Sequence, residues 1–136
     1  MPFVDDLTIT NDDQLLRRIS PQWFVPDYNE GRWRPSSASF EDSPDNTPMS
    51  VHLVSVLEAA GIPSASVLHG HEGYGLVQFA ASMARQLAQL LVRDPQPNEP
   101  AHVLVVGNKS RSIRRQFAMS AVWVVEPMGP LPPEGA

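Results

Sequence analysis

The amino-acid sequence predicts an α+β domain in which one mixed sheet of about four or five strands is covered by two or three helices. Short apolar segments suited to strands alternate with segments of helical spacing, and no internal repeat is present. The G-x-G-x-x-G turn of a dinucleotide-binding unit is missing, which argues against a doubly wound parallel sheet. We therefore expect a single domain over residues 1–126 and a proline-rich, disordered tail over residues 127–136.

The N-terminal third is expected to hold one short helix and two extended segments. Thr10 and Asp13 have the spacing of a helix cap before LLRRI, so we predict a helix that ends before Pro21. Residues 23–25 lie between two prolines and suit a brief strand. A turn over residues 31–35 leads into SSASF, whose alternation predicts a half-buried strand, and residues 41–48 read as a loop.

The middle of the chain contains one clear helix and one ambiguous segment. Ser50 precedes apolar residues at helical spacing, and Gly61 followed by Pro63 is a stop signal, so we predict a helix between them. Residues 64–75 are expected to be irregular. Residues 76–92 fit either one long helix or a strand, a short helix and a second strand. We favour the second arrangement because the segment ends on Leu-Leu-Val before a loop.

The segment AHVLVVGNKSRSIRRQFA carries the strongest functional signal. Residues 103–106 predict a buried strand, Gly107 a turn, and residues 112–121 a basic helix, followed by a short buried strand over residues 122–125. A strand-to-helix turn directs backbone N–H groups at one point, which suits an anion. The segment lacks the first glycine of G-x-x-x-x-G-K-[ST], so it is not a nucleotide-binding P-loop. The candidate ligand-binding residues are Lys109, Ser110, Arg111, Ser112, Arg114 and Arg115.

Composition excludes several classes of function. The chain has 136 residues, no cysteine and a net charge of −5, which removes thiolate chemistry and weighs against nucleic acid as a partner. No apolar run is long enough to span a membrane, and the acidic start does not resemble a secretory signal. We expect a cytoplasmic protein. Without a cysteine set or an H-E-x-x-H motif we expect no metal site, and no motif indicates a cofactor.

Five segments spread over residues 15–127 resemble a family of small uncharacterised bacterial proteins: LLRRISP, GRWRPSSASF, MSV, PAHVLVVGNKSRSIRR and WVVEP. The resemblance implies a single-domain bacterial protein and brings no activity or cofactor. A fainter likeness, carried by GRW, is to ADP-ribosyltransferase-type folds that include RES domains. That likeness implies an NAD-consuming site made by an early arginine, serines and a late glutamate, which here would be Arg18, Ser36, Ser37 and Glu126.

These observations favour a non-enzymatic binding or accessory module for an anionic small ligand or an acidic protein partner. The cations on the turn at residues 109–115 would supply the charge, on a chain that is acidic elsewhere. The alternative is an NAD-consuming enzyme of the ADP-ribosyltransferase or RES type, or a degenerate relative of one.

Overall fold

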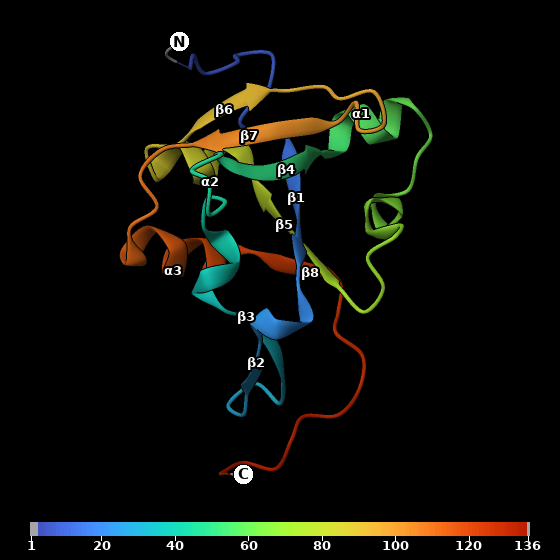
Figure 1. The fold of residues 1–136 in the computed structure, drawn as a ribbon, viewed down its shortest axis with the longest axis vertical. Helices are drawn as coiled ribbons and strands as arrows, with labels where there is room; N and C mark the ends of the chain where they lie inside the picture. The colour runs from blue at the N-terminus through green and yellow to red at the C-terminus, as the bar shows by residue number, and fades with distance from the viewer. Residues whose placement is uncertain (1–2, 136) are drawn as a thin grey trace.

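The computed structural model describes residues 3–135 and has an α+β architecture (Figure 1). A six-stranded sheet in the order β6-β7-β4-β1-β5-β8 is antiparallel throughout, and β2 and β3 form a separate hairpin. The strands are β1 (Gln14–Ile19), β2 (Phe24–Asp27), β3 (Arg32–Pro35), β4 (Met49–Leu53), β5 (Gly75–Ala80), β6 (Leu90–Arg93), β7 (His102–Val106) and β8 (Val122–Val125). The sheet is therefore larger than expected and antiparallel rather than mixed.

The helices are short apart from the last one. They are α1 (Val54–Ala59), α2 (Ala81–Gln86) and α3 (Arg111–Ser120), with 3-10 turns η1 (Pro21–Trp23), η2 (Ser37–Phe40) and η3 (Ser64–Leu68). Within residues 3–135, none of these helices is long and apolar enough to cross a membrane. Three predicted elements are confirmed: the split arrangement of residues 76–92, the strand before Gly107 and the basic helix after it.

The segment over residues 14–19 is a strand, so the predicted N-terminal helix is wrong. As β1 it lies in the middle of the sheet, paired with β4 on one side and β5 on the other. Successive side chains of a strand point to opposite faces. Leu15 and Leu16 are both fully buried and belong to different apolar clusters, one on each side. Burial on two faces therefore outweighs the local helix-cap pattern.

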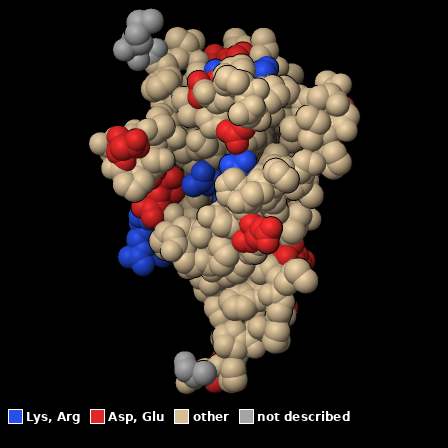
Figure 2. Space-filling view, turned by 45° about the vertical axis from the view of Figure 1, so that its right-hand side comes forward, with Lys and Arg blue, Asp and Glu red and all other residues tan. Residues whose placement is uncertain are grey.

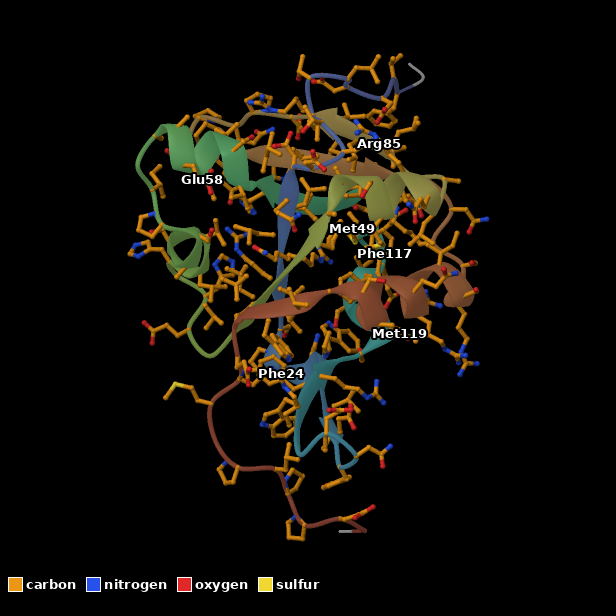
Figure 3. All side chains as sticks on the ribbon, turned by 180° about the vertical axis from the view of Figure 1, so that it is seen from behind. Phe24, Met49, Glu58, Arg85, Phe117 and Met119 are labelled. Atoms are coloured by element: carbon orange, nitrogen blue, oxygen red, sulfur yellow. The ribbon has the colours of Figure 1, made fainter. Side chains whose placement is uncertain are left out.

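The predicted strand SSASF is also wrong, because this segment forms η2. Its last residue, Phe40, is fully buried and stacks on Phe117 of α3 with ring centroids 5.7 Å apart. Phe117 meets Phe79 of β5 edge to face at 5.1 Å. Figure 3 shows Phe117 beside Met49 of β4 in the interior, and both belong to the larger apolar cluster. Packing against α3 thus sets the conformation of η2.

The helix predicted after Ser50 starts later than expected. Residues 49–53 form β4, whose Met49, Val51 and Leu53 are buried, and α1 begins only at Val54. Gly61 has a φ of +70°, so the predicted stop is confirmed at a left-handed position that favours glycine. β4 lies between β1 and β7, and this central position brings its polar residues next to those of both neighbours.

The C-terminal strand, β8, is more exposed to solvent than we expect from the sequence. β8 is an edge strand, and Val122 and Val124 are 57% and 39% exposed, rather than buried. The described part of the tail follows the β2–β3 hairpin (Figure 1). The Tyr28 hydroxyl donates to the Pro132 carbonyl at 2.8 Å, and the Trp33 indole donates to the Gly129 carbonyl at 3.3 Å. These contacts give the tail a place in the fold that its composition does not indicate.

Candidate functional site

A polar cavity opens where β1, β4 and the start of β7 meet. We call it the polar lobe; its volume is about 340 Å³, and the lining used below is Arg17, Arg18, Ser50, His52, Glu99 and His102. Figure 2 shows a hollow near the middle of one face of the molecule, where Lys or Arg side chains meet Asp or Glu side chains. Strand positions hold most of these residues, so the lobe is built on the rigid part of the fold.

Arg17 supplies a positive charge that has no close counter-ion. Its Nε donates to the Ser39 carbonyl at 3.0 Å, and its Nη1 donates to the Ser50 carbonyl at 2.8 Å. No carboxylate lies within 4.0 Å of it among the residues that the structure describes. Burial lowers the pKa of Arg17 to about 10, helped by the charge of Arg18 and opposed by the charge of Asp42, so the guanidinium stays protonated at neutral pH.

Arg18 is held from two sides. Its Nε donates to the Val67 carbonyl at 2.6 Å, and its Nη2 donates to Glu99 Oε1 at 3.0 Å. The hydrogen bond from Arg18 lowers the pKa of Glu99, against the effect of burial, and the carboxylate is ionised at neutral pH. The Arg18 side chain keeps 24% of its surface exposed, so its remaining N–H groups are accessible to a ligand.

Two histidines face each other across the β4–β7 pair. His52 and His102 are partners in the register, and their rings meet edge to face with centroids 6.0 Å apart. The His52 side chain is only 6% exposed, and its Nε2 lies 3.4 Å from Glu99 Oε1. Burial lowers the pKa of His52 to about 4, more strongly than Glu99 raises it. His52 is therefore neutral at physiological pH.

His102 is oriented by a carboxylate. Its Nδ1 lies 3.0 Å from Asp94 Oδ2 and 3.2 Å from the Asp94 carbonyl. Two acceptors at Nδ1 favour the tautomer that carries its hydrogen there, which leaves the lone pair on Nε2. Across residues 3–135, Nε2 has no hydrogen-bond partner. The polar lobe thus contains an imidazole with a free basic nitrogen and two guanidinium groups.

A second cavity continues from the polar lobe. We call it the apolar lobe; its volume is about 600 Å³, and its lining includes Leu57, Ile62 and Val67. The two lobes share Arg18, His52, His71 and Glu99, so together they form one cleft with a charged end and an apolar end. Such a cleft fits a ligand made of an anionic group and an apolar or ring-bearing group.

The predicted turn at residues 107–110 is present, but its lysine lies inside the protein. Ser110, predicted as a ligand-binding residue, caps α3 by accepting the Ile113 N–H at 3.3 Å. Lys109 Nζ donates to the carbonyls of Val105 at 2.8 Å and Gly107 at 3.1 Å, and lies 3.1 Å from Asp42 Oδ1. Its side chain is 6% exposed. The ammonium group therefore ties the turn to the loop that precedes β4, instead of facing solvent.

Replacing Lys109 with methionine should lower the free energy of unfolding by about 1–3 kcal/mol, because two carbonyls and a carboxylate lose their donor. Urea denaturation of the variant and the native chain measures the difference. The matched control is Arg111→Met, an exposed cation two residues further on, for which we expect a change within about 0.5 kcal/mol. Equal effects of the two substitutions would contradict the structural role of Lys109.

The remaining predicted binding residues divide between two places. Arg111 and Arg115 line a third cavity of about 930 Å³ between α3 and the β2–β3 hairpin, which we call the groove. Arg114 instead donates to the Lys109 carbonyl at 3.1 Å, and Ser112 accepts from Gln116 at 3.5 Å. The groove is also lined by Arg32, Trp33, Arg34, Ser37 and Trp123. Two of the six predicted binding residues therefore line the groove, and none of the six lines the polar lobe.

The four residues of the NAD-consuming alternative lie in different surroundings. Arg18 lines the cleft, and Ser37 lines the groove. Ser36 Oγ is buried without a hydrogen-bond partner in the described chain, and Glu126 pairs with Arg32 on the hairpin. Only Arg18 belongs to the cleft, so the residues that the resemblance implied do not assemble around a shared ligand position.

Sequence reasoning missed His52, Asp94, Glu99 and His102 as one cluster. The available signal was weak: His102 is the one polar residue of β7, and His52 shares the mainly apolar β4 with Ser50. The two carboxylates come from the loop between β6 and β7, and nothing in its sequence shows which strands it faces. Comparison of the chain with family models, curated proteins and solved structures finds no match.

Proposed function

We propose that the protein binds an anionic ligand in the polar lobe. The observation that carries this proposal is the buried, protonated guanidinium of Arg17, whose hydrogen bonds go to carbonyl groups only. A buried charge without an ion-pair partner is costly, and Asp42, whose charge also acts on Arg17, forms its own ion pair with Lys109. An anionic group placed between Arg17 and Arg18 would supply that counter-charge, and it would accept charge-assisted hydrogen bonds from both side chains.

The charge of the lining favours a singly charged ligand. Arg17 and Arg18 contribute two positive charges and Glu99 one negative charge, so the guanidinium and carboxylate groups of the lining sum to +1. A monoanion such as a carboxylate or a phosphodiester neutralises this charge, whereas a dianion exceeds it. The cavity of about 340 Å³ has the size of a small-ligand pocket.

Replacing Arg18 with glutamine should weaken binding of dimethyl phosphate, a monoanion that fits the polar lobe, by about 10–100-fold. The side chain loses its charge and three of its five N–H donors, and Glu99 loses its ion-pair partner. Titration followed by NMR measures the affinity, with the imidazole signals of His52 and His102 as local reporters. Arg111→Gln removes the same charge outside the cleft and should bind as the native chain does. Unchanged affinity of the Arg18 variant would refute the proposed site.

A second candidate function rests on the groove. Four arginines and two acidic residues line it, so a surface with a net charge of +2 lies on a chain whose net charge is −5. Trp33 and Trp123 add aromatic surface, and Met119 on α3 is 78% exposed beside them. Arginine and aromatic residues are enriched where proteins bind one another. The groove suits an acidic segment of a partner protein that also carries aromatic or apolar residues.

Reversing the charge of Arg111 and Arg115 together, as Arg111→Glu with Arg115→Glu, should abolish binding of a peptide in which aspartate and tyrosine alternate. In the double variant the new glutamates repel the aspartates of the peptide, which the two arginines attract in the native chain. Salt screens this attraction, so the affinity of the native chain should fall as ionic strength rises. Fluorescence anisotropy of the labelled peptide measures both effects. The control adds negative charge to α3 away from the groove, as Ser112→Glu with Gln116→Glu. If both double variants weaken binding equally, the groove is not the binding surface.

A further inference from the structure

We infer that the cleft is catalytic: His102, oriented by Asp94, acts as the general base in the hydrolysis of a phosphodiester whose phosphate is held by Arg17 and Arg18. The inference rests on the proposed function, because it places the bound anion of that proposal at the reacting position. The inference adds an activity, a substrate class and a role for His102 and Asp94, which do not take part in the proposed anion binding.

The geometry of His102 suits a general base. The Asp94 carboxylate, 3.0 Å from Nδ1, is itself positioned by the Gln96 side chain, which donates to the same oxygen at 3.0 Å. The contacts at Nδ1 therefore fix the orientation of the imidazole. The other nitrogen, Nε2, has no hydrogen-bond partner in the described residues, and the ring lines a polar cavity. A carboxylate that orients an imidazole in this manner prepares it to accept a proton from a nucleophile.

The polar lobe contains two separate pairs of charged or ionisable groups. Glu99 is engaged by Arg18, and the neutral His52 ring separates that ion pair from His102 across the β4–β7 register. His102 pairs with Asp94, whereas Arg18 pairs with Glu99. The base and the two guanidinium groups line the same cavity. A reacting phosphate can then lie between a nitrogen that takes a proton and guanidinium groups that hold charge.

The reaction follows from these positions. A water molecule attacks phosphorus, a new P–O bond forms, and the water proton passes to Nε2 of His102. The P–O bond to one ester group breaks, its electron pair leaves with the ester oxygen, and the imidazolium returns the proton to that oxygen. The products are a phosphate monoester and an alcohol, and His102 ends neutral. Arg17 and Arg18 hold the non-bridging oxygens, where negative charge increases in the transition state.

The apolar lobe determines the class of ester. It adjoins the polar lobe at Arg18 and His52, so a ligand whose phosphate reaches the guanidinium groups extends one substituent toward Leu57, Ile62 and Val67. A phosphodiester carries two substituents and a single negative charge, which matches both the shape of the cleft and the +1 sum of its guanidinium and carboxylate groups. The substrate is thus a phosphodiester with at least one apolar or aromatic ester group.

The full chain should hydrolyse bis(p-nitrophenyl) phosphate faster than buffer does and release one p-nitrophenolate from each molecule. The aromatic group fits the apolar lobe, and its release is followed by absorbance. His102→Ala should lower kcat by about 10²–10⁴-fold with little change in KM, and added imidazole should restore part of the rate, because it replaces the missing base. A histidine that only supports the fold would give no recovery with imidazole.

Asp94 is a positioning residue, and its variant tests that role. Asp94→Asn should lower kcat less than His102→Ala does and leave KM unchanged, because the imidazole remains but loses its fixed orientation. Asp12→Asn makes the same change at an exposed aspartate that does not line the cleft, and it should hydrolyse the diester at the native rate. Equal rates for Asp94→Asn and Asp12→Asn would remove Asp94 from the mechanism.

The outcomes separate the two proposals. Binding of dimethyl phosphate without cleavage of bis(p-nitrophenyl) phosphate would overturn the catalytic inference and leave the proposed binding function in place. Cleavage that persists in His102→Ala would show that another group is the base, and the inference fails. Absence of dimethyl phosphate binding in the native chain would refute the proposed function, and with it the catalytic role of the cleft.

Discussion

Phe117→Ala should lower the free energy of unfolding by about 3–5 kcal/mol, the largest effect we expect from any single substitution described here. Phe117 is fully buried and is the contact through which α3 holds two other parts of the fold. Its ring stacks on Phe40 of η2 and meets Phe79 of β5 edge to face. Alanine would leave a cavity between the helix and the sheet, and both aromatic contacts would be lost.

Urea denaturation should show a lower midpoint with an unchanged slope, since the surface exposed on unfolding stays nearly the same. Met119→Ala is the matched control: the residue lies on the same helix, is 78% exposed, and its loss should cost less than about 0.5 kcal/mol. A Phe117 variant as stable as the Met119 variant would contradict the packing of α3 on η2 and β5.

Acidification from pH 6.5 to pH 4 should destabilise the protein by an amount on the order of 3 kcal/mol through His52 alone. Burial lowers the pKa of His52 to about 4, whereas the unfolded chain has the ordinary value of about 6.5. Between these values the unfolded state binds more protons than the folded state. Stability therefore rises with pH in this window and is lost as pH falls through it.

The measurement is a series of urea denaturation curves between pH 7 and pH 4. His52→Gln removes the titrating group and should show a flatter pH dependence across the window, whatever its own stability at neutral pH. The pKa of Glu99 lies below its usual range, so the stability it contributes is lost at lower pH. A native chain whose stability does not change between pH 6.5 and pH 5 would contradict the burial of neutral His52.

The sequence predicts the fold best where apolar segments are short and bounded by turn signals. Residues 103–106 and the helix after them follow directly from such a pattern, and residues 76–92 divide as expected. The prediction fails at β1, where Thr10 and Asp13 have the spacing of a helix cap but precede a central strand. The spacing of apolar residues along the chain reveals an element that buries one face, whereas a strand in the middle of a sheet buries both faces. Only the pairing with β4 and β5 distinguishes the observed strand from the predicted helix.

The site is less predictable than the fold for a related reason. Lys109 belongs to a basic run in the sequence, yet its ammonium group is buried against Asp42, which lies 67 positions earlier in the numbering. His52 and His102 become neighbours through the β4–β7 register, and Asp94 and Glu99 reach them from a loop. Spacing along the chain carries no information about such contacts, because each depends on which strands pair.

The position of Arg17 and Arg18 on β1 has a consequence for how the cleft moves. β1 pairs with β5 along its whole length and with β4 at Leu15 and Leu16, so it belongs to the central part of the sheet, which we expect to open last. The guanidinium groups of Arg17 and Arg18 are therefore preorganised, and ligand binding requires no movement of β1. Occupancy of the cleft should instead slow hydrogen exchange at the sheet centre, which couples ligand binding to global stability.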